Sequence, residues 1–503
     1  MTLDPASLTI ISVDDHLVEP PDMFEGRLAA KFAERAPRVV ERADGREMWL
    51  FEGVEIPNFG LNAVSGRPQE EYGIEPTRFD EIRRGCWDRE ARIDDMNAGG
   101  ILASLNFPSF PQFCGQIFAN TEDKELALAV LQAYNDWHIE EWAGGAPGRL
   151  IPLSLVPYWD PEVMAAEVRR VAARGVRAVT WSENPEKIGV PSFHSPHWDP
   201  FWHACDELGM VICLHIGSSS AVKLPTVEAP FTTMLNLQPT AVMDTAADLL
   251  WSRVIRLFPN IRFALSEGSI GWIPYLLERA DYVYEHHNRW TGSDFGGRLP
   301  SEVFRDHFIA CFITDSAGLR MLDLIGPEIV CVETDYPHSD STWPASPERL
   351  TGQLEHLPRE TIDAITHGNA IRLFGFDPFA HHAPEDCTVG ALRARAGHVD
   401  VGPVEPRASF VAPERPLTLL DMLSRAEHPL LEKQAAEGML SDADAWTALA
   451  AARNRAGDTA GARAACERAL TVQAGHPEAT QLLSTLPAPK PASSEPVKPT
   501  SKS

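Results

Sequence analysis

The sequence predicts an α/β protein whose main domain is a closed (β/α)8 barrel, also called a TIM barrel, with a helical extension at its C-terminus. Eight short runs rich in Val, Ile and Leu occur between residues 8 and 333, and a helical pattern follows each of them. Parallel strands need crossover connections of a dozen or more residues, and eight strand–helix units close a barrel. A doubly wound open sheet is the alternative, but no G-x-G-x-x-G motif follows the first run.

The expected strands are apolar runs bounded by turn-forming residues, at 8–13, 101–106, 150–156, 176–181, 210–215, 261–265, 307–313 and 328–333. Apolar residues at helical spacing lie between them, at 88–97, 121–143, 160–174, 199–208, 239–257, 272–289, 316–324, 346–355 and 359–373. Gly99 and Gly100 end the first helix, as glycine often does. Residues 20–87 are rich in Pro, Gly and charge, and we expect an irregular excursion that covers the substrate.

The composition changes after residue 378, so we expect the barrel to occupy residues 1–378. Residues 379–415 contain few strand formers and are expected to be a linker or a belt on the barrel. Residues 416–484 have a helical, Ala- and Leu-rich pattern that loosely matches one tetratricopeptide repeat, at Trp446, Leu449, Gly457, Ala462 and Ala469. Because one repeat is not stable alone, this segment is expected to pack on the barrel, on another subunit or on a protein partner. Residues 485–503 are expected to be a disordered tail.

Composition and charge exclude some classes of partner. Apolar residues make up 44% of the chain, enough for a sizeable core, and the formal net charge of −27 argues against nucleic acid, whose phosphates would be repelled. No apolar run approaches the roughly 20 residues that span a bilayer, so we expect no membrane contact. The first residues lack a basic region followed by an apolar core. With eight scattered cysteines and no C-x-x-C pair, we expect reduced thiols and a cytoplasmic location.

Four residues with metal-binding side chains stand at the ends of expected strands. Asp14 and His16 end the first strand two positions apart, so an extended backbone places both side chains on one face. His215 ends the fifth strand and Asp335 follows the eighth, and these ends meet at the carboxyl mouth of a barrel. Two imidazoles and two carboxylates suit one divalent ion such as zinc or manganese. The alternatives for single residues are a turn cap for Asp14, an ion pair with an Arg for Asp335, and a hydrogen-bonded core or surface position for His215.

Several motifs, in order along residues 8–378, resemble the amidohydrolase-2 branch of the amidohydrolase superfamily, the aminocarboxymuconate-semialdehyde decarboxylase-like group. The motifs include Asp14-x-His16 with Glu19-Pro20, Leu214-His215-Ile216-Gly217, Glu267-Gly268, Thr334-Asp335-Tyr336-Pro337-His338 and Gly368-Asn369-Ala370. The resemblance implies a barrel with one divalent metal ion, with zinc expected and manganese as the alternative. It also implies that Asp14, His16, His215 and Asp335 bind this ion. It does not extend to residues 379–503.

The chain departs from this resemblance at two places. The first-strand pair of the family is His-x-His or Glu-x-His, whereas this chain has Asp14. Some decarboxylases of the group carry a His after the sixth strand, where this chain has Glu267. If burial raised its pKa, Glu267 would serve as a general acid or base beside Asp335; the alternative is an ion pair with Lys223 or Arg279.

Two further residues are candidates for binding the substrate. His338 follows Asp335 by three positions, which places it at the expected mouth of the barrel. Trp181 ends the fourth strand, where its ring would face either the barrel or the helices around it. We expect both to contact the substrate.

Two reactions and one non-catalytic role fit these residues. The favoured function is non-oxidative decarboxylation of a small aromatic or unsaturated carboxylic acid, because the relatives implied by the resemblance do that chemistry. The first alternative is metal-dependent hydrolysis of an ester, lactone or amide, in which Asp335 would take a proton from water. The second is a scaffold without catalysis. A small-molecule substrate and a homodimer are expected, with a protein partner for the C-terminal helices.

Overall fold

The computed structural model describes residues 3–56, 60, 62–72, 76–226, 229–402, 415–419, 421–422, 443–455 and 459–486. The chain divides into two compact units, one made of Met1–Leu224 and Thr233–Ala412 and the other of Pro225–Thr232 and Pro413–Ser503. Most of the expected C-terminal tail, from residue 487 onward, lies outside the described residues.

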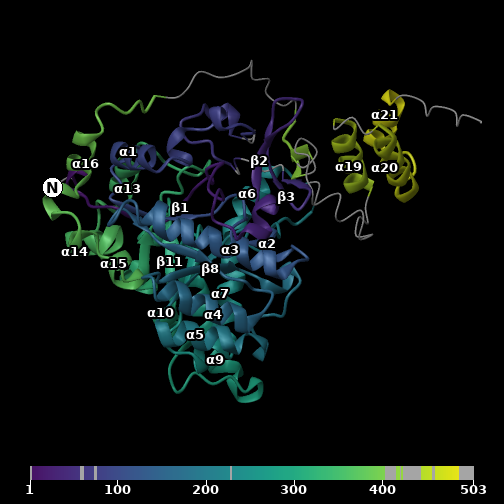
Figure 1. The fold of residues 1–503 in the computed structure, drawn as a ribbon. Helices are drawn as coiled ribbons and strands as arrows, with labels where there is room; N and C mark the ends of the chain where they lie inside the picture. The colour runs from purple at the N-terminus through teal and green to yellow at the C-terminus, as the bar shows by residue number, and fades with distance from the viewer. Residues whose placement is uncertain are drawn as a thin grey trace, which may run out of the picture. The chain divides into compact units, whose positions relative to one another are not determined.

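Parallel strands surround the centre of the first unit and form the predicted barrel (Figure 1). They are β1 (Ile11–His16), β5 (Ala103–Phe107), β6 (Leu150–Ile151), β7 (Leu153–Leu155), β8 (Ala178–Ser182), β9 (Val211–His215), β10 (Arg262–Ser266), β11 (Phe308–Phe312) and β12 (Val330–Val332). One ladder runs β1–β5–β6 and the other β7–β8–β9–β10–β11–β12. The backbone N–H of Asp335 donates to the carbonyl of Asp14, and that of His16 donates to the carbonyl of Tyr336, which joins the last strand to the first. The (β/α)8 prediction is therefore confirmed.

The expected strand at 150–156 is divided into β6 and β7. Pro152 stands between them and has no backbone N–H to donate to a ladder, so the two pieces pair with different neighbours. β6 pairs with β5, and β7 pairs with β8.

Helices surround the strands in the chain up to residue 402 (Figure 1). They are α1 (Arg89–Gly99), α2 (Gln116–Ala119), α3 (Lys124–Trp137), α4 (Pro161–Ala172), α5 (Asp199–Leu208), α6 (Phe231–Leu237), α7 (Ala241–Trp251), α8 (Val254–Leu257), α9 (Ile273–Thr291), α10 (Pro300–His307), α11 (Ser316–Leu319), α12 (Leu322–Ile325), α13 (Ser346–Leu354), α14 (Arg359–Asp363), α15 (Asn369–Phe374) and α16 (Val389–Arg395).

Two features of this helical layer differ from the sequence-based expectation. The helix expected at 239–257 is broken after α7, because Ser252 is extended and its hydroxyl accepts the N–H of Val254 at the start of α8. Helix α10 was not predicted; Pro300 stands in its first turn, and the Glu302 carboxylate accepts the N–H of Leu299.

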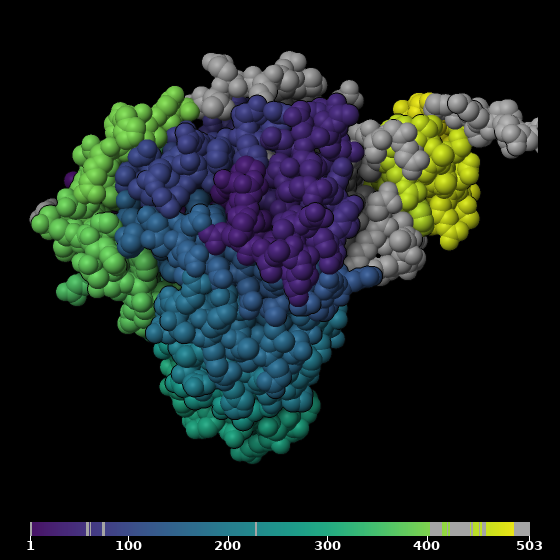
Figure 2. All heavy atoms as spheres, in the orientation of Figure 1, coloured from purple at the N-terminus to yellow at the C-terminus, as the bar shows by residue number. Residues whose placement is uncertain are grey.

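Residues 20–87 are not wholly irregular, and in this part the prediction was wrong. They contain an antiparallel sheet of β2 (Arg38–Glu41), β3 (Glu47–Phe51) and β4 (Val54–Ile56). Asp44-Gly45 forms the turn between β2 and β3, with Gly45 at a φ of +83°, and such a dipeptide is a hairpin signal. In Figure 2 this purple N-terminal segment forms a broad, continuous part of the visible surface.

The two sides of the barrel strands carry different residues. In β9, Val211 and Cys213 join the apolar cluster that fills the barrel, whereas Ile212 and Leu214 join the cluster shared with the outer helices. His215, the next residue in this alternation, therefore points inward. All eight cysteines are free and buried.

In β1 the alternation is shifted by a register irregularity between Ser12 and Asp15. Val13 belongs to the interior cluster, yet Asp14 and His16 also turn toward the barrel axis, and Asp15 instead accepts hydrogen bonds from Ser12 and Thr334. A bulge of this kind changes the direction of the side chains that follow it.

Residues 378–402 belong to the first unit and include α16. The N–H of Val389 donates to the carbonyl of Leu8, and Val389 and Leu392 are buried. The second unit contains α19 (Ala443–Arg455), α20 (Thr459–Val472) and α21 (Pro477–Thr485). Its small core includes three of the repeat-like positions, Leu449, Ala462 and Ala469, whereas Gly457 lies outside the described residues. Within the described part of the chain, no helix is both long and apolar enough to span a bilayer.

Candidate metal centre

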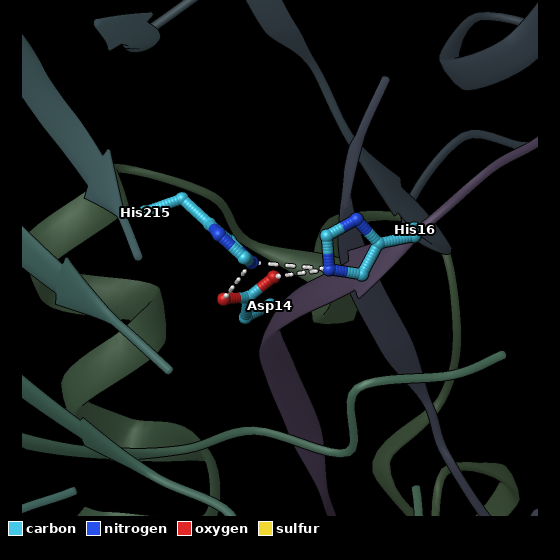
Figure 3. Close-up of side chains that lie close together, drawn as sticks. All are labelled: Asp14, His16 and His215. Atoms are coloured by element: carbon cyan, nitrogen blue, oxygen red, sulfur yellow. Dashed lines mark hydrogen bonds and ion pairs between the residues drawn. The ribbon is translucent and has the colours of Figure 1, made fainter. Parts of the chain in front are cut away.

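Three side chains from β1 and β9 meet at the carboxyl end of the barrel (Figure 3). His16 Nε2 lies 3.6 Å from Asp14 Oδ1, and His215 Nε2 lies 3.5 Å from Asp14 Oδ2. The two Nε2 atoms are 3.1 Å apart. His215 Nδ1 donates to the carbonyl of Ile216, which fixes the ring and turns the lone pair of Nε2 toward the other two residues.

Asp335, in the loop after β12, approaches His16 and forms a second close group with His16 and His338. Its Oδ1 lies 3.3 Å from His16 Nε2 and 3.2 Å from His338 Nδ1. The His338 ring stacks on the His16 ring at a centroid distance of 3.5 Å. Asp335 has a φ of +51°, which is unfavourable for a residue with a side chain and which the surrounding contacts must hold in place.

Glu267, after β10, completes the group. Its Oε2 lies 3.3 Å from His215 Nε2. The alternative partners proposed for it are engaged elsewhere: Lys223 pairs with Asp244, and the Arg279 guanidinium lies over the Tyr282 ring. Glu267 is therefore close to the ligand-type residues rather than in a surface ion pair.

Sequence reasoning missed Glu333, which is 2% exposed beside this group. Its Oε1 accepts the backbone N–H of Glu267, and Glu267 has a φ of +58°. Glu333 precedes Asp335 by two positions at the end of an expected strand. The period-two rule that placed Asp14 with His16 would also have placed Glu333 with Asp335.

Trp181 does not enter the site, which corrects the expectation that it binds substrate. Its ring is fully buried among Phe193, Trp198, Phe201 and Trp202, on the side of β8 that faces the helices. Ala178 of the same strand joins the interior cluster, so the alternation turns Trp181 outward.

The electrostatics of the site are dominated by carboxylates. Burial, followed by the charges of Glu333, Asp335 and Glu267, raises the pKa of Asp14 well above its usual value. Burial, followed by the charge of Asp335, does the same to the pKa of Glu267. Burial, followed by the charge of Asp340, raises the pKa of Asp335. None of these carboxylates pairs with a Lys or Arg among the described residues.

The histidines have the opposite shift. Burial lowers the pKa of His215 to about 3, and burial together with the nearby His338 and His215 lowers the pKa of His16 well below its usual value. Both imidazoles are therefore neutral at physiological pH, which is the form that binds metal.

This arrangement fits a divalent cation. The carboxylate oxygens of Asp14 and Asp335 are buried, and their neighbours given above are imidazole nitrogens 3.2–3.6 Å away rather than a Lys or Arg. Buried carboxylates without a cationic partner are costly, and a cation between them would remove that cost. Neutral imidazole nitrogens and carboxylate oxygens are common ligands of zinc and manganese.

The fold and these side chains define a TIM barrel with a candidate metal site at its carboxyl mouth. The chain belongs to the amidohydrolase family, whose sequence model matches residues 56–376.

Individual relatives are more distant. The 2-amino-3-carboxymuconate-6-semialdehyde decarboxylase of Dictyostelium discoideum is 23% identical over 310 residues, which are 60% of this chain and 80% of the relative. An amidohydrolase from Mycobacterium avium subsp. paratuberculosis superposes with a TM-score of 0.55 at 22% identity, over 73% of this chain and 98% of that one. The 5-carboxyvanillate decarboxylase of Novosphingobium aromaticivorans, solved with bound manganese, has a TM-score of 0.52 at 16% identity, over 74% and 98%. These superpositions agree with the barrel fold.

Proposed function

We propose that the chain is a metal-dependent, non-oxidative decarboxylase of a small aromatic or unsaturated carboxylic acid. The observation that carries this proposal is that Asp14, His16 and His215 form one close group of buried ligand-type side chains and that His16, Asp335 and His338 form a second, with His16 in both. The family match and the decarboxylase from Dictyostelium support the choice of reaction. A scaffold without catalysis would have no need for this costly group of buried charges.

These four residues would hold the ion, with zinc as our choice and manganese as the alternative. Manganese is the ion bound in the crystal structure of the Novosphingobium enzyme. A bound divalent ion would supply a positive charge that attracts and polarises the substrate's carboxylate or a neighbouring hydroxyl.

The protein's own carboxyl groups would move the proton. When the bond between the substrate and its carboxylate breaks, the electron pair stays on the carbon and carbon dioxide leaves. That carbon needs one proton, and Asp335 or Glu267 would donate it, because both carboxyls lie beside the imidazoles of the centre, with Asp335 Oδ1 3.3 Å from His16 Nε2 and Glu267 Oε2 3.3 Å from His215 Nε2. His338 Nδ1, 3.2 Å from Asp335 Oδ1, would orient Asp335 for this transfer.

The reaction is tested by measuring carbon dioxide released from a panel of aromatic and unsaturated acids by the zinc- or manganese-loaded enzyme. An ester, lactone and amide panel beside it tests the hydrolytic alternative. Asp335→Asn should stop turnover and lower metal affinity, since the amide neither carries the charge nor donates an acidic proton. Normal carbon dioxide release by this variant would contradict the role of Asp335.

We also propose a cytoplasmic homodimer in which the second unit binds a protein partner. The eight free, buried cysteines are consistent with a reducing compartment.

On α9, Tyr275 is 70% exposed and Trp290 is 75% exposed, and large exposed aromatic side chains are common at subunit interfaces. Sedimentation of the purified chain tests the dimer.

A further inference from the structure

The ring of Phe113 borders the candidate metal centre. Phe113 lies in the loop between β5 and α2. Its ring centroid is 4.3 Å from that of His215, 5.2 Å from that of His16 and 6.2 Å from that of His338. One aromatic side chain therefore lies against three imidazoles at the site.

Another aromatic residue touches two of these imidazoles but has a different environment. The Phe107 ring is 4.8 Å from the His215 ring and 5.8 Å from the His16 ring, and it is fully buried. Phe113, in contrast, is only partly buried. Phe107 therefore forms the packed support of the histidines, whereas Phe113 has surface left for another molecule to cover.

The backbone around Phe113 is held in a defined position. The Thr180 hydroxyl of β8 donates to the carbonyl of Phe113 at 2.7 Å. The preceding residue, Gln112, has a φ of +61°, which a side chain rarely adopts without surrounding constraint. Gly217, after β9, lies against the same ring: a Cβ atom on it would be 3.5 Å from the Phe113 ring, in ordinary van der Waals contact. Such fixed positioning is typical of binding residues on loops.

We propose that Phe113 is a specificity-determining residue, against which the planar part of the substrate packs. The inference rests on the proposed function, because the substrate's carboxylate must sit beside His16 and His215 for its ring to reach Phe113. An aromatic ring packs well on another ring, offset or edge to face, whereas a puckered ring of similar size makes fewer such contacts. Phe113 therefore favours planar acids over puckered ones.

The test compares the binding of two acids of similar size to the metal-loaded full-length chain by calorimetry. The probes are 4-hydroxybenzoate, which is planar, and cyclohexanecarboxylate, which is not. Phe113→Leu should weaken 4-hydroxybenzoate binding by about threefold to tenfold, which is the worth of one aromatic contact. The same substitution should change cyclohexanecarboxylate binding by less than about twofold. Phe113→Trp should keep the preference for the planar acid.

A matched control is Phe110→Leu, in the same loop. Phe110 is buried and stacks on Trp49 at a centroid distance of 4.4 Å, away from the imidazoles, so this change should lower thermal stability but keep the ratio of the two affinities. Metal content should be equal in all variants. Equal losses for both acids in Phe113→Leu, no loss for either, or no binding of 4-hydroxybenzoate to the unaltered chain would overturn the inference.

The two proposals can fail separately. If no acid yields carbon dioxide but 4-hydroxybenzoate still binds in a manner that depends on Phe113, the proposed reaction is wrong and the role of Phe113 stands.

Discussion

At the scale of single residues, His215 is the ligand-type side chain that β9 brings to the centre. His215→Ala removes an imidazole nitrogen that lies within 3.5 Å of both Asp14 and His16. We expect at least a tenfold loss of metal affinity, with an unchanged far-UV circular dichroism spectrum, because the strand is held by its ladders with β8 and β10. Metal analysis after dialysis measures the loss.

The control for this prediction is His194→Ala. His194 is exposed and pairs with Asp248 rather than with any of the ligand-type residues, so its removal should leave metal content unchanged. Retention of both metal and activity in His215→Ala would remove His215 from the centre.

Part of this site could be predicted from residue spacing, because side chains two positions apart on a strand lie on the same face. Asp14 with His16, and His215 at a strand end, could be found from the sequence. The bulge in β1 could not, because it depends on hydrogen bonds from Ser12 and Thr334 that form only in the folded barrel. Trp181 shows the other limit: its position at a strand end predicted substrate contact, whereas the alternation along β8 turns its ring toward the helices.

At the scale of elements, Glu19 joins the loop after β1 to the loop after β5. Its carboxylate accepts the N–H groups of Ser109 at 3.0 Å and Phe110 at 2.7 Å. Burial raises the pKa of Glu19 from 4.5 to about 7. The folded state therefore holds this proton to a higher pH than the unfolded state does, so the contribution of Glu19 to stability falls as pH rises from about 4.5 to about 7.

We predict that Glu19→Gln flattens the dependence of the unfolding free energy on pH between pH 5 and pH 7.5. A pKa difference of this size corresponds to a loss of about 3 kcal/mol across the range, as an upper bound. Urea unfolding at several pH values measures the slope, which is informative even though the amide also weakens one hydrogen bond. Glu25 is exposed, so Glu25→Gln is the control and should leave the slope of unfolding free energy against pH unchanged. If Glu19→Gln leaves the slope unaltered, the Glu19 carboxyl has the same pKa in the folded and the unfolded state.

Elements were predictable where one strong pattern controls them. The barrel strands are continuous apolar runs, and their positions follow from the sequence to within a few residues. The sheet of β2, β3 and β4 was missed because its outer strands are largely exposed and show little apolar pattern. Helix α10 depends on a proline and a capping glutamate rather than on a long periodic run.

At the scale of the whole molecule, barrel closure is what creates the centre. Asp14 and Asp335 are far apart in sequence, and the hydrogen bond from the Asp335 N–H to the Asp14 carbonyl brings their backbones together. A chain with a net charge of −27 concentrates several carboxylates there without a Lys or Arg partner among the described residues. The bound cation would therefore stabilise the folded barrel as well as take part in its chemistry.

Residues 413–503, which form most of the second unit, should be dispensable for that chemistry. All candidate site residues lie in the first unit, and the family match ends at residue 376. The described core of the second unit is small and rich in alanine, including Ala448, Ala450, Ala462 and Ala465, so it buries little apolar surface. A chain ending at residue 412 should keep its metal and its rate of carbon dioxide release to within about twofold, as expected for independent parts of a protein. Sedimentation of the same truncated chain shows whether the removed residues contribute to assembly. Loss of the metal or of turnover in a truncated chain that still folds would mean that residues after 412 support the centre directly.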